Sequence, residues 1–587
     1  MSDYSQFKIA SYAHAPYLAH TSEAEILRQI DYFKKYLGGL DKVYLEIHRG
    51  EHHVLPEELR RYIELFRENG ITVAGGFTAT TDLEVRDVHR IFDVYCYSRE
   101  NFREELRKNV ASTAQYFDEL ILDDFFFTSC RCKECIRRKG TQSWPQYRLN
   151  LMKEMAQLVC DTAKSVNPDC KCVIKYPNWF ESWQETGYNP KEQKDIFDGI
   201  YTAAESRNPK MSQQHLPRYL SYSLVRYMEN AAPAKNLGAW IDTGDSSNNM
   251  NWYAQQVLLA AFAGAKELCL FGFGGLMDEP WLPMLGESLR GADAFIAKAG
   301  KNCGVPVYYP FNADQGEDQL FNYIGMLGIP LEPAPYFNKA AKTMLLTAAA
   351  AQDENLMDKL KDYVENGGHA VITGGLLRIL ENKGILDMTS ARPGTSVVSG
   401  TCFCTDPYIG DRRDFHSCPE PVMLHSLDYK TNATWSEAEL ITENCNYPVF
   451  LRDDYGSGEL YVWNIPDNFS DLYKLPMGVL NLIRQNFAKH LDAYIEADPQ
   501  YNLFLYDNNM LAVQSYREYR EHMTIVIKGA CEGLKDLVSG QVYRPVGVKA
   551  RPKQRFDVAW VPEHDREYAF EIYFQPGTVK YFEIMRI

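Results

Sequence analysis

Two adjacent acids and three cysteines share one short stretch of the chain, LDDFFFTSCRCKEC at residues 122–135. Asp123 and Asp124 end an apolar run, and carboxylates can donate a proton, activate water or attack carbon. Three cysteines with C-x-C-x-x-C spacing follow, namely Cys130, Cys132 and Cys135. Thiolates at such spacing are typical ligands of a metal ion. The stretch therefore predicts two neighbouring sites, one for acid–base chemistry and one for a metal.

The metal site needs a fourth ligand, because a closed structural zinc site has four. Cys96, in VYCYSRENFRE, follows the third strand that we expect, next to the loop with the other cysteines if the strands form a barrel. We therefore predict a structural zinc ion bound by Cys96, Cys130, Cys132 and Cys135, and no organic cofactor. The alternative is four buried free thiols. Four thiolates leave no position for water, which disfavours a zinc-dependent hydrolase.

Composition excludes several classes of protein. The 587 residues are 45% hydrophobic and 24% charged, which is typical of a globular chain of two to four domains. The formal net charge of −16 argues against a nucleic-acid partner, because binding needs a basic face. Aromatic residues make up 13%, which favours a carbohydrate site, although a large core also uses them.

Neither a membrane span nor a leader is visible in the sequence. The longest apolar stretch is shorter than the ~18 residues that a span requires, so we expect no membrane partner. The first twenty residues lack a basic segment followed by an apolar one. We expect a cytoplasmic protein if the chain is complete, and a periplasmic or secreted one if a signal peptide was removed.

Eight apolar segments alternate with amphipathic ones in the first ~300 residues. The expected strands are 8–15, 42–50, 71–80, 118–127, 171–179, 199–207, 238–245 and 267–275. Helical spacing of apolar residues is found in 22–38, 56–70, 99–117, 147–166 and 251–265. Strands separated by helices form parallel sheets, and eight such units predict an α/β fold, the (β/α)8 TIM barrel, over residues 1–303.

Two further domains are expected. Residues 304–494 alternate strand and helix as a flavodoxin-like α/β domain does, without a Gly-rich phosphate loop, so we expect a structural role. Residues 495–587 contain short alternating strands with turn residues between them, which predicts a small antiparallel β-sandwich.

Barrel enzymes have their sites on the loops that follow the strands, so polar residues there are candidates. They are Glu46, His48 and Arg49 after the second strand, Asp123 and Asp124 after the fourth, Lys175, Tyr176, Asn178 and Trp179 after the fifth, Glu205 and Arg207 after the sixth, Asp242 and Asp245 after the seventh, and Asp278 and Glu279 after the eighth. Glycoside hydrolysis needs one acid to protonate the leaving oxygen and a second carboxylate to attack or to activate water. Together these residues predict a glycoside hydrolase.

The chain resembles the β-galactosidases of glycoside hydrolase family 42. Residues 95–110, YCYSRENFREELRKNV, are similar to the family's segment with its first zinc cysteine, and residues 122–135 to its Asp-Asn-Glu-Tyr-Gly stretch leading into C-x-C-x-x-C. Residues 251–275 and 363–375 resemble its last barrel unit and its second domain. The resemblance implies a carbohydrate substrate and a homo-oligomer, a trimer formed through the flavodoxin-like domain.

The chain departs from this family at its reacting groups. Asp123 and Asp124 stand where the family has Asn and Glu, so the acid/base position matches Asp124, one methylene shorter. The family's nucleophile, a Glu ending strand seven, matches Asp242. Shorter side chains can widen the gap between the carboxyl groups, and wider gaps belong to inverting enzymes. β-Galactosidase activity therefore does not follow from the resemblance.

A second assignment resembles α-glycosidase families, with Asp124 as nucleophile after strand four and Glu205 as acid/base after strand six. Lys175 would then orient the sugar. We predict that Asp124 acts with Glu205 or Asp242. The expected substrate contacts are Arg49, Asp123, Lys175, Asn178, Trp179, Arg207 and Trp252. The alternative is a non-catalytic carbohydrate-binding protein on a hydrolase scaffold.

Overall fold

The computed structural model describes residues 2–81, 92–208, 216–244, 246, 249–407, 413–550 and 566–587. Asp245, one of the expected strand-end acids, lies outside these residues. The chain forms two compact units, Met1–Ala297 and Lys298–Ile587. Among the described residues, no helix combines the length and the apolar character needed to cross a bilayer.

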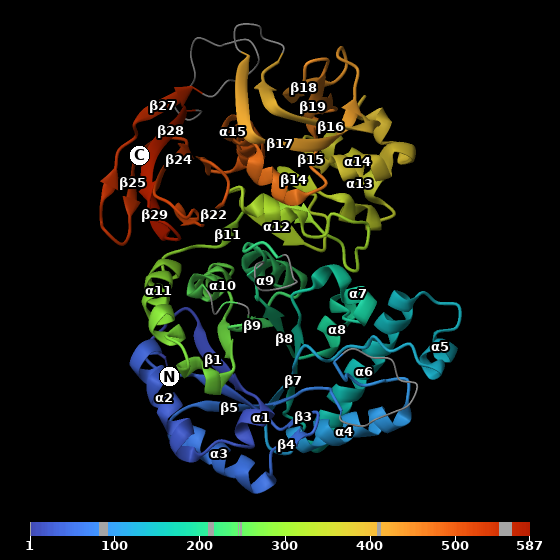
Figure 1. Ribbon diagram of the computed structural model, residues 1–587, viewed down its shortest axis with the longest axis vertical. Helices are drawn as coiled ribbons and strands as arrows, with labels where there is room; N and C mark the ends of the chain where they lie inside the picture. The colour runs from blue at the N-terminus through green and yellow to red at the C-terminus, as the bar shows by residue number, and fades with distance from the viewer. Residues whose placement is uncertain are drawn as a thin grey trace. The chain divides into compact units, whose positions relative to one another are not determined.

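The first unit is a closed barrel of eight parallel strands (Figure 1). The strands are β1 (Lys8–Ala13), β2 (Lys42–Glu46), β5 (Thr72–Phe77), β6 (Glu119–Leu122), β7 (Lys171–Tyr176), β8 (Gly199–Ala203), β9 (Asn236–Ile241) and β10 (Glu267–Phe271). Seven of the expected strand segments contain one of them, and the segment 238–245 overlaps β9, which begins two residues earlier. The predicted TIM barrel is therefore confirmed.

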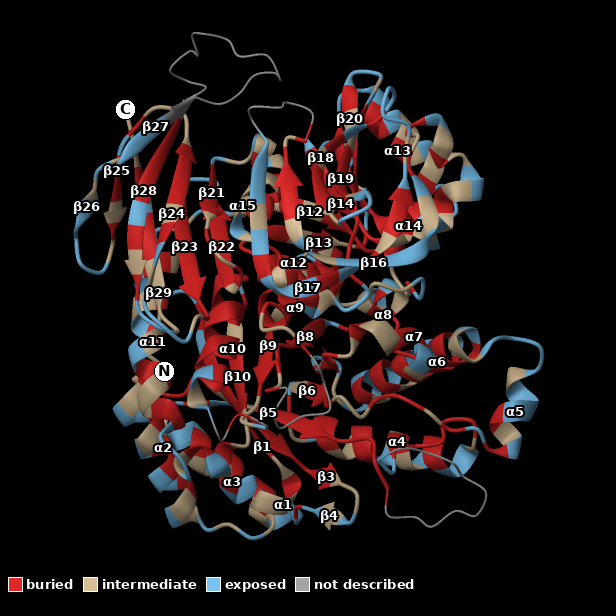
Figure 2. Cartoon of the chain, turned by 45° about the horizontal axis from the view of Figure 1, so that its top comes forward, coloured by how far each residue is buried: buried red, intermediate tan, exposed pale blue. Residues whose placement is uncertain are grey.

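Helices surround the barrel, and most of them bury one face. The longer ones are α2 (Glu23–Leu37), α3 (Pro56–Glu68), α4 (Glu100–Ala114), α6 (Trp144–Val166), α9 (Leu220–Ala231), α10 (Met250–Phe262) and α11 (Trp281–Ile296). In α3, Leu59, Tyr62, Ile63 and Phe66 are buried, a spacing that makes one apolar stripe. Figure 2 shows the result, with buried strands inside and exposed outer faces on the helices.

The N-terminal end of the barrel contains a network of charged side chains. Lys42 Nζ lies 3.0 Å from Glu119 Oε1 and 2.9 Å from Glu267 Oε1. Tyr44 OH donates to Glu119 at 2.6 Å, and Tyr201 OH donates to Glu267. Burial works to lower the pKa of Lys42, but the two carboxylates outweigh it and raise that pKa. The lysine is therefore held in its charged form.

The second unit begins with a parallel sheet. Its strands are β12 (Val305–Tyr308), β13 (Leu331–Ala334), β14 (Thr343–Leu346), β15 (His369–Thr373) and β20 (Gly458–Trp463), in the spatial order β13-β12-β14-β15-β20. Helices α12 (Leu320–Gly325), α13 (Leu356–Glu365), α14 (Gly374–Leu380) and α15 (Met477–Phe487) accompany them. Numbered along the chain this is the order 2-1-3-4-5 of flavodoxin-like folds, as the sequence predicts.

Four antiparallel strands extend this sheet beyond β20. They are β19 (Asn446–Tyr455), β18 (Trp435–Ile441), β16 (Arg392–Thr405) and β17 (Asp414–Asp428), and they bring the sheet to nine strands. These four strands were not predicted from the sequence. They are inserted between β15 and β20, which pair directly with each other, so the parallel core is left intact.

The C-terminal part is an antiparallel sandwich of two sheets. One has the order β11-β22-β23-β29-β25-β26 and the other β21-β24-β28-β27. The strands are β11 (Asn302–Cys303), β21 (Ala493–Glu496), β22 (Tyr501–Tyr506), β23 (Met510–Ser515), β24 (Glu521–Lys528), β25 (Cys531–Asp536), β26 (Val542–Tyr543), β27 (Gly547–Ala550), β28 (Arg566–Phe574) and β29 (Val579–Arg586). Residues of both sheets share one apolar core, which accounts for the stability of such short strands.

A buried arginine joins this sandwich to the preceding α/β part. Arg484 of α15 donates from Nε to Leu327 O at 2.6 Å and from Nη1 to Ala497 O at 2.5 Å. Asn502 Nδ2 also donates across, to Gly325 O at 2.9 Å. Burial lowers the pKa of Arg484 to about 9. Backbone carbonyls from both parts therefore satisfy one guanidinium group.

Candidate active site

Lys175 lies at the centre of a group of acids at the C-terminal ends of the barrel strands. Its Nζ donates to Asp124 Oδ2 at 2.9 Å and to Glu205 Oε1 at 3.2 Å, and it lies 3.6 Å from Asp123 Oδ1. The three acids follow β6 and β8, and Lys175 is in β7, between those strands in the barrel. Burial lowers the pKa of Lys175, but the carboxylates outweigh it and raise that pKa. Parallel neighbouring strands thus bring one ammonium group to three carboxylates.

Asp123 is buried and held as an anion. Arg49 Nη2 donates to its Oδ2 at 2.6 Å, and the backbone N–H of Asp124 donates to its Oδ1 at 2.8 Å. Burial alone would raise the pKa of Asp123, but Lys175 and Arg49 lower it to about 2. With both oxygens engaged, Asp123 has little left to offer a substrate.

Glu46, a strand-end candidate without an assigned role, anchors Arg49. Its carboxylate is fully buried and accepts from Arg49 Nε at 2.9 Å, Tyr12 OH at 2.7 Å and the Ala15 backbone N–H at 2.7 Å. Thr78 Oγ1 also donates to it. Its position at the end of β2 was the only signal in the sequence. Glu46 fixes the guanidinium that reaches Asp123.

Asp124 differs from its neighbour because its side chain is 16% exposed. Burial, Asp123 and Glu205 raise its pKa to about 7, against the opposing effect of Lys175. Its backbone carbonyl accepts a hydrogen bond from Tyr188 OH at 2.5 Å, which fixes the main chain at this point. A carboxyl group with this pKa can hold a proton at neutral pH and release it to a substrate.

Glu205 and Asp242 share a second cation, Arg207. Arg207 forms a two-pronged ion pair with Asp242, with Nη2 3.0 Å from Oδ2, and lies 3.5 Å from Glu205 Oε2. Asp242 is 18% exposed, whereas Glu205 is 2% exposed. Burial and Asp242 raise the pKa of Glu205, while Lys175 and Arg207 oppose them. The two partly exposed carboxyl groups of this cluster are therefore Asp124 and Asp242.

The other expected substrate contacts are Asn178, Trp179 and Trp252, and they differ in the residues that they contact. Asn178 is buried and donates to Glu205 O at 2.8 Å. Trp179 is partly buried, with its ring 6.5 Å from that of Tyr188, the residue that contacts Asp124. Trp252 is buried in α10 beneath Arg218, whose guanidinium carbon is 4.0 Å from the ring centroid. Within the described residues no contact joins Trp252 to the carboxylates.

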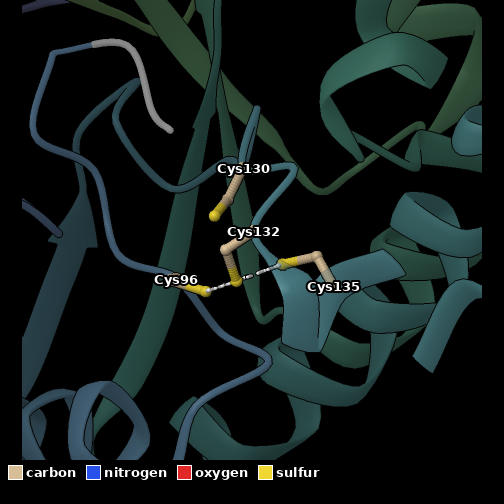
Figure 3. A group of neighbouring side chains, drawn as sticks. All are labelled: Cys96, Cys130, Cys132 and Cys135. Atoms are coloured by element: carbon tan, nitrogen blue, oxygen red, sulfur yellow. Dashed lines mark hydrogen bonds between the residues drawn. The ribbon is translucent and has the colours of Figure 1, made fainter. Parts of the chain in front are cut away.

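The four expected cysteines lie together beyond the acids (Figure 3). All are buried, and their sulfur atoms lie within 4.8 Å of one another. The Cys96 sulfur is 3.8 Å from that of Cys132 and 3.6 Å from that of Cys135. A tetrahedral zinc ion with bonds of about 2.3 Å would space its sulfurs about 3.8 Å apart. The group can therefore hold a metal ion, which would fasten the loop after β5 to the loop after β6.

A TIM barrel with clustered carboxylates at the C-terminal ends of its strands has the architecture of a glycoside hydrolase. Comparison with known families agrees. Residues 1–285 match the family described as "Probable glycosyl hydrolase, catalytic domain", and residues 492–584 match "Probable glycosyl hydrolase, C-terminal domain". Residues 300–468 match the second domain of the uncharacterized protein SSO3021. The barrel is thus similar to this family of glycosyl hydrolase catalytic domains.

A curated relative and several solved structures extend the comparison. Uncharacterized protein SSO3021 of Saccharolobus solfataricus is 26% identical over 397 residues, a match covering 60% of this chain and 64% of that protein. The chain thus spans less than two thirds of the relative's length.

Two solved structures show the same fold along the whole chain. The β-galactosidase of Bacillus circulans sp. alkalophilus is 11% identical, covers 99% of this chain and 100% of its own, and has a TM-score of 0.63. The α-L-fucosidase isoenzyme 2 of Paenibacillus thiaminolyticus is 10% identical, with the same coverage and a TM-score of 0.65. At such identity the likeness concerns the fold, and the family-42-like architecture is confirmed.

Proposed function

We propose that the protein hydrolyses glycosidic bonds of an uncharged oligo- or polysaccharide, with Asp124 as the general acid and Asp242 as the second carboxylate. The observation that carries this proposal is the state of Asp124. Its carboxyl is reachable from solvent, and burial with two neighbouring acids raises its pKa to about 7. A general acid works best when its pKa lies near the working pH.

Asp242 is favoured as the partner of Asp124 because a substrate can reach it. It is 18% exposed, and Arg207 holds its carboxylate in place through a two-pronged ion pair. Glu205 is 2% exposed, and burial raises its pKa. We assign Glu205 the role of orienting Lys175 and Arg207, both of which contact it.

One observation favours the other pairing, Asp124 with Glu205. Both accept hydrogen bonds from the same Lys175 Nζ, so their nearest oxygens are no farther apart than the two bonds laid end to end, about 6.1 Å. Carboxyl groups of retaining glycosidases lie about 5–5.5 Å apart. This pairing predicts retention of configuration and a covalent intermediate on one of the two residues.

The charge of the site supports a neutral substrate. Five carboxyl groups, Glu46, Asp123, Asp124, Glu205 and Asp242, meet three cations, Arg49, Lys175 and Arg207. Whether or not Asp124 and Glu205 hold protons, the charges of these described groups do not add up to a positive sum. An acidic sugar would meet no excess of positive charge here.

The test is a set of acid-to-amide variants assayed on aryl glycosides with good and poor leaving groups. We expect Asp124→Asn to slow the poor leaving groups about 100- to 10,000-fold and the good ones much less, because only the former need a proton. We expect Asp242→Asn to slow both, with partial rescue by azide if Asp242 is the nucleophile. Asp161→Asn, an exposed acid on α6, is the matched control.

The outcomes separate the assignments. Azide rescue of Glu205→Gln in place of Asp242→Asn would favour the second pairing. Full activity of Asp124→Asn on poor leaving groups would overturn the proposal. Binding of an oligosaccharide by the wild type without any turnover would instead support the carbohydrate-binding alternative.

We also propose that the ion at Cys96, Cys130, Cys132 and Cys135 is zinc. Four buried sulfurs at these spacings suit its tetrahedral geometry and leave no site for a reacting water. We expect one zinc per chain by elemental analysis, and a lower melting temperature after chelation. Cys132→Ser should give the same loss of stability, whereas Cys445→Ser, at an exposed cysteine, should not. A metal-free wild type would refute the assignment.

The quaternary structure implied by the family-42 resemblance stays a prediction. A homotrimer would show three times the 67.4 kDa chain mass by light scattering. The compartment, and the domain limits at residues 303 and 494, likewise stay predictions.

A further inference from the structure

His14 occupies a place at the barrel mouth that the catalytic assignment leaves unexplained. It directly follows β1, and the short helix α1 (Ala15–Leu18) begins at the next residue. Because β1 lies between β10 and β2 in the barrel, its C-terminal end lies between the strand that ends at Phe271 and the strand that leads to Arg49. The His14 ring centroid is 6.0 Å from that of Phe271.

One ring nitrogen of His14 has no hydrogen-bond partner among the described residues. This atom is Nδ1, which is buried, and the side chain does not cap α1. The backbone N–H of the next residue, Ala15, binds Glu46 Oε2 at 2.7 Å. Leaving a buried polar atom unpaired costs free energy, so such atoms in folded proteins call for an explanation. The ring as a whole is only partly buried, so a ligand in the mouth can reach its exposed edge.

The surroundings of His14 favour its neutral form. Burial lowers its pKa, Glu46 raises it, and Arg49 and His52 lower it further. A neutral imidazole presents one donor and one acceptor, and a sugar hydroxyl can satisfy either. Nearby Arg49 donates from Nε to Glu46 and from Nη2 to Asp123.

A row of rings connects His14 to the catalytic cluster. Phe271 lies between His14 and Trp240, with its ring centroid 5.5 Å from that of Trp240. Lys175 Nζ in turn lies 4.4 Å from the Trp240 ring centroid. Phe271 is partly exposed, and a partly exposed ring offers an apolar surface to the C–H face of a pyranose. A sugar resting there would have His14 at one side and the acids around Lys175 at the other.

We propose that His14 forms a hydrogen bond with a ring hydroxyl of the sugar whose glycosidic bond is cleaved, and so sets the selectivity among sugars that differ at that hydroxyl. This inference rests on the proposed glycoside hydrolase function. It adds a contact from the first barrel strand, where the sequence suggested none. The preferred substrate is therefore a neutral pyranoside with an apolar face toward Phe271 and a free hydroxyl toward His14.

The test combines a substitution that removes the His14 nitrogens with substrates that each lack one hydroxyl. His14→Phe keeps a ring beside Phe271 but removes both nitrogens, and it is assayed with the best 4-nitrophenyl glycoside and its monodeoxy analogues. Sites built to hydrogen-bond a hydroxyl strongly reject analogues that lack it. We expect His14→Phe to lower kcat/KM for the parent about 10- to 100-fold and to remove the discrimination against one analogue only. His14→Gln should restore part of this discrimination. His20→Phe, at an exposed histidine, should change neither kcat/KM for the parent nor the discrimination. Equal loss on every analogue would overturn the inference.

A binding measurement distinguishes this failure from failure of the proposed function. Asp124→Asn, labelled with nitrogen-15 in its histidine rings, is titrated with galactose, fucose, glucose and mannose. The His14 ring signals are those that the added His14→Phe change removes. If a sugar shifts these signals while no glycoside is hydrolysed, the inference holds and the catalytic proposal fails. If no sugar shifts them, the inference is overturned, whatever the activity of the wild type.

Discussion

Each end of the barrel contains a lysine bound to carboxyl groups, but the two groups of residues differ in the other partners of those carboxyl groups. At the N-terminal end Lys42 contacts Glu119 and Glu267, and at the C-terminal end Lys175 contacts Asp124 and Glu205. In both places burial lowers the pKa of the lysine and the carboxylates outweigh it. Charge and burial alone therefore do not tell a structural cluster from a reactive one.

The difference lies in the remaining partners of the carboxyl groups. At the N-terminal end each glutamate also accepts a hydrogen bond from a tyrosine hydroxyl, Glu119 from Tyr44 and Glu267 from Tyr201. At the C-terminal end Asp124 accepts a hydrogen bond from Lys175, and burial together with acidic neighbours raises the pKa of Asp124 to about 7. A network whose acceptors are satisfied stabilises the fold, whereas one with a protonatable, reachable carboxyl can act on a substrate.

Of the changes that compare the two ends of the barrel, Lys175→Met should have the largest effect. Removing a preorganised charge from a site of this kind costs about 100- to 1,000-fold in rate. We expect such a loss in kcat/KM with a small change in melting temperature, because Asp124 and Glu205 can take up protons when the lysine is gone. Kinetics and thermal unfolding of the same preparation measure both. A melting temperature lowered more than that of Lys42→Met would contradict the comparison.

The matched change at the other end, Lys42→Met, should lower stability and leave the kinetics alone. Breaking a buried ion pair costs about 3–5 kcal/mol, and since these groups are partly exposed we expect about 2 kcal/mol. Urea unfolding gives the free energy, and kcat/KM of the folded protein is the control. Unchanged stability would show that this network contributes nothing to the fold.

The smallest effect is the pH dependence of the wild type. If Asp124 donates the proton, kcat/KM on a poor leaving group falls as pH rises through about 7, because the acid loses its proton there. The decline approaches tenfold per pH unit. Lys42→Met should keep this profile, whereas Lys175→Met should move it to higher pH, because Lys175 lowers the pKa of Asp124. A flat profile through neutral pH would exclude Asp124 as the acid.

Much of the barrel could be predicted because parallel strands, buried on both faces, leave continuous apolar runs in the sequence. Cys96 could be joined to the other cysteines for a related reason, since consecutive barrel strands are neighbours. The role of Glu46 could not be predicted, because its donors come from two strands, one helix and one loop that are separated along the chain.

The strands β16–β19 were missed for a different reason. In β17 buried and exposed residues alternate irregularly, and β16 pairs with it through two shifts of register. Such a strand lacks a clean two-residue period, which is the signal that sequence analysis uses. The hairpin of β3 (His48–Arg49) and β4 (His52–His53) is too short to show any period.

Arg484 has a consequence for how the second unit unfolds. Its guanidinium binds carbonyls of both the α/β part and the sandwich, at Leu327 and Ala497, and separating the two parts would break these hydrogen bonds. The sheets are also interlocked along the chain, since β11 precedes the α/β part yet pairs with β22 of the sandwich. Residues 298–587 should therefore melt in one cooperative transition, and a calorimeter should register them as one folding unit.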